Sequence, residues 1–168
     1  FGTNIIGVAP GRIQTHGAPP SGLPTAVRPL SFDDARALQR LPNVTAIGPV
    51  IFGNAEIEGN GRTRRTTVYG VTEDALQVFN MRVAAGQFLP ADEWEGARAF
   101  VVLGSTLKNE LFGSGNALGA KLRAGGLQFR VVGVLASKGE FLGIDLDDTA
   151  FIPTARAMEL FNKDGLAE

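Results

Sequence analysis

A serine and a lysine stand three residues apart in Ser105-Thr106-Leu107-Lys108, which matches the S-x-x-K motif of serine acyl-transferring enzymes. On a helix, this spacing brings an amine within one turn of a hydroxyl that it can activate as a nucleophile. Ser114-Gly115-Asn116 resembles the companion S-x-N motif, but it begins only nine residues after Ser105 and no K-T-G follows. We therefore favour a helix-capping Ser105 and a solvated Lys108, with acyl transfer as an alternative.

The densest group of acidic residues consists of Asp145, Asp147 and Asp148, with Glu140 upstream. Carboxylate oxygens suit calcium or magnesium, but the glycine and the closing glutamate of an EF-hand loop are missing here. A turn that leads into a strand at Thr149 is the simpler interpretation, so we expect no metal site. Gly113-x-Gly115 likewise follows a helix, whereas phosphate-binding loops precede one, so we expect no phosphate site.

Two short segments have the chemistry of contact surfaces. Three arginines close to a predicted turn form a local basic patch that can bind a carboxylate or a partner protein, although charge on an edge strand also prevents aggregation. Two apolar residues between glycines form a possible exposed tip, a feature that often marks a contact site. The predicted partner-contact residues are Arg62, Arg64, Arg65, Phe141 and Leu142.

Two further residues have side chains that often take part in function. His16 lies in a proline-rich segment without a nucleophile or ligand nearby, and we interpret it as a surface residue. Trp94 stands among acidic residues and either stacks on a ligand or covers the edge of a core. A free-standing ligand-binding module with Trp94 or the acidic loop in its site is therefore a second alternative. We find no set of acid, base and nucleophile, and expect no catalytic residue and no cofactor.

The composition narrows the function further. The chain has 168 residues with 16 basic and 17 acidic side chains, a net charge of −1, which provides no overall positive field for nucleic acid. The absence of cysteine excludes disulfides, thiolate catalysis and cysteine-ligated metals, and a single histidine argues against histidine metal sites. No stretch reaches the ~18 apolar residues that span a bilayer. We expect one folded, non-catalytic unit.

The elements that position these residues alternate between strands and short helices without a regular βαβ repeat, which predicts the α+β class. Helices are expected where apolar residues recur at helical spacing and a cap precedes them. Strands are expected at β-branched runs, and glycine-containing turns predict two hairpins. Helices are predicted at 31–41, 73–79 (capped by Thr72), 105–112 (ended by a left-handed Gly113) and 154–161, and strands at 1–8, 44–57, 62–71, 99–103, 120–123, 127–136 and 149–152.

A series of short segments occurs in a characteristic order and spacing along the chain. It includes Phe1-Gly-Thr-Asn-Ile-Ile-Gly-Val-Ala-Pro-Gly, Leu41-Pro-Asn-Val-Thr-Ala-Ile-Gly-Pro, Val68-Tyr-Gly-Val-Thr, Val101-Val-Leu-Gly-Ser, Phe129-Arg-Val-Val-Gly-Val-Leu and Asp147-Asp-Thr-Ala-Phe-Ile-Pro-Thr. Each segment is weak alone, but together they cover nearly the whole chain. In their order and spacing, these segments resemble the periplasmic core domain of MacB-type ABC transporter permeases, which has FtsX-like and lipoprotein-release relatives.

The resemblance implies a mixed α/β ectodomain of two small subdomains on the periplasmic face of the bacterial inner membrane. Residues 1–71 would begin a discontinuous subdomain, 72–153 would form the inserted one, and 154–168 would start a truncated return segment. Transmembrane helices outside this fragment would anchor the domain, which would couple ATP-driven motion to a partner or substrate. The implied partners are a second permease copy, a cytoplasmic ATPase and, in some members, a periplasmic adaptor protein.

Overall fold

The computed structural model describes Ile6, Val8 and residues 31–141 and 144–163 of the chain. Contacts divide the chain into two units, Phe1–Thr45 and Ala46–Glu168. Strands and short helices alternate in the described residues, which confirms the predicted α+β class. The strand predicted at 1–8 falls mostly outside these residues, and Ile6 and Val8 are not in a strand. His16 also lies outside the described residues.

The first unit contains helix α1 (Phe32–Gln39), which confirms the helix predicted there. Ser31 is its N-cap residue and forms a reciprocal capping box with Asp34. The Asp34 N–H donates to the Ser31 hydroxyl at 3.2 Å, and the Ser31 N–H donates to the Asp34 carboxylate at 2.8 Å. The box satisfies backbone donors that the first helical turn leaves without partners.

The second unit begins with a hairpin of strands β1 (Ile51–Gly59) and β2 (Arg62–Val71). Asn60 and Gly61 form the predicted two-residue turn, with φ of 54° and 71°. The strand predicted at 44–57 starts only at Ile51. Pro49 explains the difference, because it has no N–H to donate to a neighbouring strand.

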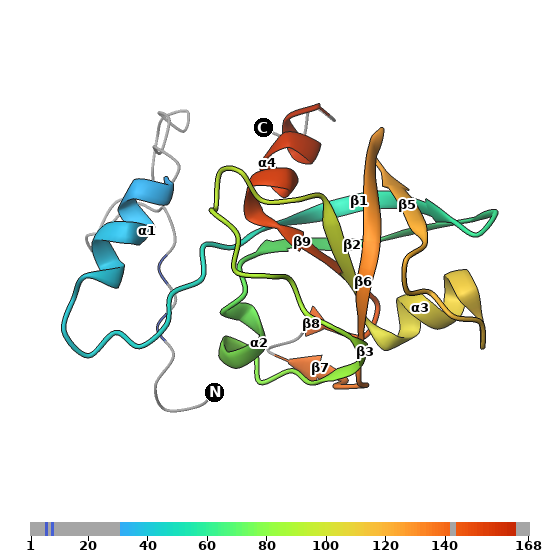
Figure 1. Cartoon of the computed structure of the whole chain (residues 1–168), viewed down its shortest axis with the longest axis horizontal. Coiled ribbons are helices and arrows are strands. Elements are labelled where there is room, and N and C mark those ends of the chain that lie inside the picture. Colours follow the sequence, from blue (N-terminus) through green and yellow to red (C-terminus); the bar gives the residue numbers. More distant parts are fainter. Residues whose placement is uncertain (1–5, 7, 9–30, 142–143, 164–168) are drawn as a thin grey trace, which may run out of the picture. The chain divides into compact units, whose positions relative to one another are not determined.

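The strands of the second unit, drawn in Figure 1, include six that bond to one another in a closed ring. Hairpin β5 (Lys121–Ala124) and β6 (Leu127–Leu135) turns at Gly125 and Gly126, as predicted. Strand β6 also pairs with β4 (Phe100–Leu103), which pairs with β9 (Thr149–Pro153). Strand β9 pairs with β2, and β1 pairs with β5, which closes the ring.

Apolar clusters cover both faces of this sheet. Side chains alternate along a strand, so Val101 and Leu103 join one cluster whereas Val102, between them, joins the other. The first cluster includes residues of α3 (Ser105–Phe112) and α4 (Thr154–Lys163). The second includes Ala75 of α2 (Ala75–Val78). The sheet is therefore packed on both of its faces.

Three local predictions need correction. Helix α2 spans only Ala75–Val78, and the Thr72 side chain does not cap it; Asp74 is its N-cap residue. The Thr72 carbonyl, and not its hydroxyl, accepts a hydrogen bond from the Ala75 N–H, at 3.0 Å. Gly113 has the expected positive φ of 56°, but its ψ of −133° is not left-handed helical.

Three strands were not predicted: β3 (Val83–Gly86), β7 (Glu140–Phe141) and β8 (Ile144–Asp145). Strand β3 pairs with the second half of β6, and β7 pairs with β8. Strand β3 has two alanines and a glycine among its four residues, so it lacks the β-branched signal. The division of the chain after residues 71 and 153 stays a prediction.

Candidate functional site

Arg64, one of the three arginines predicted to contact a partner, pairs with carboxylates of the same chain. Its guanidinium makes two hydrogen bonds with the Asp148 carboxylate, at 3.0 and 2.7 Å, and lies 3.6 Å from the Glu110 carboxylate. The Arg64 hydrogen bond lowers the pKa of Asp148, with a smaller opposing effect of burial. Paired charges at partly exposed positions stabilise a fold modestly. Arg64 therefore joins β2 to the turn that precedes β9.

Arg62 and Arg65 are exposed. The Arg62 guanidinium donates to the Glu110 carbonyl at 3.1 Å, near the last turn of α3, where the helix dipole favours a cation. Asn60 reinforces this junction, because its side-chain amide donates to the Leu111 carbonyl at 3.0 Å. The hairpin tip is thus fixed against α3, and the contact role of Arg62, Arg64 and Arg65 stays a prediction.

Of the apolar tip predicted at Phe141 and Leu142, only Phe141 lies among the residues that the structure describes. Phe141 belongs to β7 and pairs through its backbone with Ile144 of β8. Leu142 lies outside the described residues. The contact role of Phe141 and Leu142 therefore also stays a prediction.

The acidic residues near β9 bond within the chain. The buried Asp147 carboxylate accepts from the Lys138 N–H at 2.7 Å, the Gly139 N–H at 2.9 Å and the Ser137 hydroxyl at 2.9 Å. Burial raises the pKa of Asp147, but these three hydrogen bonds outweigh it, and the net shift is downward. Among the described residues, no group of three or more acidic or histidine side chains is arranged to hold a metal ion.

The serine and lysine of the S-x-x-K motif line a surface groove together with Ser114 and Asn116 of the S-x-N motif. The groove runs between α3 and β3, with an open volume of about 880 Å³. The Lys108 ammonium, however, donates to the Gly113 carbonyl at 2.7 Å, at the C-terminal end of α3. Within the described part of the chain, no hydrogen bond joins Ser105 to Lys108. This geometry gives the acyl-transfer alternative no support.

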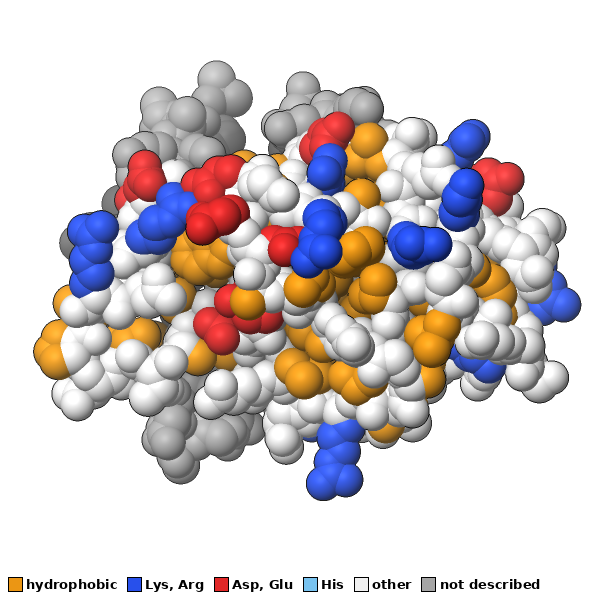
Figure 2. All heavy atoms as spheres, in the orientation of Figure 1, with side chains coloured by type: hydrophobic (Ala, Val, Ile, Leu, Met, Phe, Trp, Pro, Cys, Tyr) orange, Lys and Arg blue, Asp and Glu red, His pale blue; other side chains and the backbone are white. Residues whose placement is uncertain are grey.

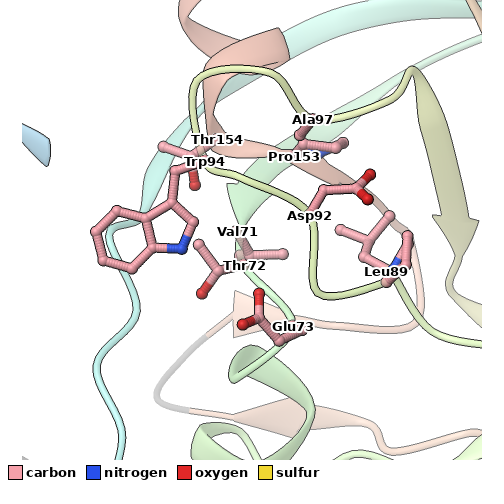
Figure 3. A pocket seen from close by; sticks show the side chains of 10 residues that line it. Val71, Thr72, Glu73, Leu89, Asp92, Trp94, Ala97, Pro153 and Thr154 are labelled. Carbon is pink, nitrogen blue, oxygen red and sulfur yellow. The ribbon is translucent and has the colours of Figure 1, made fainter.

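Trp94 lines a smaller pocket with Thr72, Glu73 and Asp92, which Figure 3 shows. Thr72 is buried, with 6% of the residue exposed, and its hydroxyl oxygen has no hydrogen-bond partner within the described chain. Asp92 is held by Arg98, whose guanidinium donates to it at 2.9 and 3.0 Å. The sequence indicates Trp94 as a candidate but not Thr72, whose position before a short helix is typical of a cap.

Charge is distributed unevenly over the second unit. On the face drawn in Figure 2, acidic side chains gather over α2 and the loop from β3 to β4, whereas basic side chains are scattered over the strands.

No helix among the described residues is long and apolar enough to cross a membrane.

Comparison with known proteins settles the family. The family model described as the MacB-like periplasmic core domain matches residues 1–166. The chain belongs to this family. The MacB-like core domain is periplasmic, which implies an extracytoplasmic location for this chain, as the resemblance predicted.

Curated relatives are export proteins. The chain is 34% identical over 165 residues to the pyoverdine export ATP-binding/permease protein PvdT of Pseudomonas entomophila, covering 96% of this chain and 24% of PvdT. It is 33% identical over 170 residues to the macrolide export ATP-binding/permease protein MacB of Hyphomonas neptunium, covering 99% of this chain and 26% of MacB. The chain thus spans about a quarter of the length of these relatives.

Solved structures share the fold. The periplasmic region of MacB from Actinobacillus actinomycetemcomitans superposes with a TM-score of 0.69 at 20% identity, over 79% of this chain and 59% of that one. The extracellular domain of the Gram-positive ABC-type transporter YknZ gives a TM-score of 0.68 at 17% identity, over 79% and 67% of the two chains. The MacB-like core domain of this chain therefore has the α+β fold of these ectodomains.

Proposed function

We propose that this MacB-like core domain is the extracytoplasmic part of an ABC exporter and transmits ATP-driven motion to a molecule outside the inner membrane. The observation that supports this most is the family match over residues 1–166. Transmembrane helices elsewhere in the full protein anchor the domain, and a cytoplasmic ATPase drives it. A second permease copy and a periplasmic adaptor protein are its proposed partners. The domain itself makes and breaks no bonds.

Two features of the fold suit this role. The closed strand ring and its two apolar clusters form a body that moves as a unit, which efficient transmission of a displacement requires. The β1–β2 hairpin projects exposed Arg62 and Arg65 from this body while its tip is fixed to α3. We propose these two arginines as contacts for an acidic surface of a partner, with Arg64 stabilising the hairpin behind them.

Export and ATP hydrolysis of the full-length protein in proteoliposomes test this proposal. Replacement of residues 46–163 by a flexible glycine-serine linker is expected to abolish export while ATP hydrolysis continues, because hydrolysis occurs elsewhere. The double variant R62E/R65E is expected to lower export about fivefold or more, since like charges now face the partner. Arg123, an exposed arginine on β5, provides the matched control R123E.

The two variants test separate claims. Continued export by the linker variant would contradict the proposed function. Equal export by R62E/R65E and R123E would contradict only the assignment of the partner contact to the hairpin.

A further inference from the structure

The last turn of α3 depends on the tip of the β1–β2 hairpin. The last four carbonyls of an α-helix have no donor within the helix. The first and the fourth of them in α3 accept from backbone N–H groups of the loop that follows the helix. The two carbonyls between them, of Glu110 and Leu111, accept from the side chains of Arg62 and Asn60, at 3.1 and 3.0 Å. The hairpin tip therefore completes the C-terminal end of α3.

Asn60 stands in a sequence with a chemistry of its own. It is the one asparagine of the 168-residue chain that precedes a glycine, Gly61. Both residues are exposed and form the two-residue turn, with φ of 54° and 71°. Because glycine has no side chain, nothing on Gly61 shields its backbone nitrogen from the Asn60 side chain. An asparagine in this setting loses its side-chain amide more readily than one before a larger residue.

The reaction needs only the chain and water. The Gly61 nitrogen attacks Cγ of Asn60, so that an N–Cγ bond forms and the bond from Cγ to Nδ2 breaks. The proton of the Gly61 N–H leaves with Nδ2 as ammonia, and a five-membered succinimide remains. Water then adds to one of the two succinimide carbonyls and opens the ring to aspartate or to isoaspartate. Nothing is oxidised or reduced.

The fold restrains this reaction through the contact with α3. The Asn60 Nδ2 group donates to the Leu111 carbonyl, so this bond must break before the side chain can turn toward its own backbone. The Arg62 guanidinium, bonded to the next carbonyl of the helix, holds the tip in the same place. Conversion of Asn60 is therefore expected mainly when the hairpin tip leaves α3, a local opening of the fold.

The product cannot restore the contact. An ionised carboxylate only accepts hydrogen bonds, so it leaves the Leu111 carbonyl without its donor. Its negative charge also lies near the C-terminal end of α3, where the helix dipole disfavours an anion. The isoaspartate product adds a carbon to the backbone as well, which a two-residue turn between paired strands does not accommodate.

We propose that Asn60 is a deamidation site of this chain, and that its conversion removes a cap from α3 and releases the hairpin tip. The hydrogen bond to Leu111 sets the rate, because the reaction waits for the tip to open. The reaction alters the chain once and turns over no substrate, so the proposal does not depend on the transport role.

Incubation of the folded 168-residue chain at mildly alkaline pH, followed by peptide mass spectrometry with detection of isoaspartate, tests the site. We expect Asn60 to convert severalfold faster than Asn43 and Asn80. These two asparagines also have positive φ, of 69° and 50°, but they precede Val44 and Met81. The chain unfolded in urea is expected to convert at Asn60 faster than the folded chain.

A variant of the neighbouring contact tests the control by α3. Arg62→Ala weakens the attachment of the tip and is expected to speed conversion of Asn60 about 2- to 10-fold, the effect of one lost hydrogen bond. The matched control is Arg123→Ala, which removes an exposed arginine of β5 and is expected to leave the rate unchanged.

A second variant tests the consequence of the reaction. Asn60→Asp is expected to raise the equilibrium constant of unfolding in urea about 5- to 30-fold, since the Leu111 carbonyl loses its donor. The control is Asn116→Asp, because Asn116 uses its side-chain oxygen to accept from the Leu118 N–H, and a carboxylate keeps this bond. That variant is expected to match wild type.

Three results would overturn the proposal. The first is the absence of conversion at Asn60 in the folded chain over the period in which the unfolded chain is converted. The second is an equal rate of conversion in Arg62→Ala and Arg123→Ala. The third is equal stability of Asn60→Asp and Asn116→Asp, because the side-chain donor would then not hold the tip against α3.

Discussion

Gly133→Ala is expected to lower the free energy of unfolding by about 3 kcal/mol or more. Gly133 lies on β6 opposite Gly86 of β3, and a β-carbon built on it would stand 1.9 Å from the Gln87 carbonyl oxygen. That oxygen belongs to the backbone, so no side-chain rotation relieves the clash. Strand β3 would have to move away from β6, together with the start of the loop that lines the Thr72 pocket.

Urea unfolding followed by circular dichroism measures this effect, with Gly96→Ala as the control. Gly96 has open space where a β-carbon would stand and no positive φ, so its substitution is expected to change stability by less than about 0.5 kcal/mol. Equal unfolding midpoints for the two variants would contradict the close approach of the β3 and β6 backbones at Gly133.

Asp147→Asn is expected to cost about 2 kcal/mol at pH 7, because an amide cannot accept all the hydrogen bonds that the ionised carboxylate accepts. The backbone donors at Lys138 and Gly139 would compete for a single amide oxygen. The N–H groups of Thr106 and Leu107 donate to the Asp147 carbonyl, so the residue also fixes the first turn of α3. Loosening of Asp147 would therefore affect both α3 and the segment before β7.

The pH dependence of the free energy of unfolding tests whether the ionised Asp147 carboxylate supplies this stabilisation. The folded state lowers the pKa of Asp147, so its stabilisation is complete above the ordinary carboxyl pKa of about 4 and is lost as the pH falls through the lower folded value. The stability difference between wild type and Asp147→Asn should thus shrink below about pH 4. The exposed Glu140 provides the control variant Glu140→Gln, which should match wild type at pH 7. A difference that stays constant down to pH 2 would contradict the account.

Local chemistry made much of the fold predictable. Asn60 and Gly61 tolerate positive φ, which placed the first hairpin, and Ser31 with Asp34 placed the start of α1. A compact apolar run with two valines placed β4. Strand β3 could not be predicted in this way, because its residues Val83–Gly86 become a strand only by pairing with β6, about 50 residues later in the chain.

The sites depend more on distant contacts than the strands do. The basic patch and the acidic group were each considered alone, yet Arg64 and Asp148, 84 positions apart, bond to each other. The Thr72 pocket needs the end of β2, the β3–β4 loop and α4 in one place, and no spacing in the sequence indicates that they meet. Threonine before a short helix is typical of a cap, so the unpaired hydroxyl became visible only in the structure.

The most direct measurement of the proposed coupling is a distance between domains during the ATP cycle. The chain contains no cysteine, so spin labels can be attached at Glu56→Cys and Gln128→Cys, exposed positions on β1 and β6, in a full-length protein without other cysteines. Pulsed EPR of the reconstituted protein compares the nucleotide-free and vanadate-trapped states. We expect the distance between Gln128 labels of two copies to change while the distance from Glu56 to Gln128 within one copy stays constant. An unchanged distance between copies, with ATP hydrolysis intact, would contradict transmission of motion by this domain.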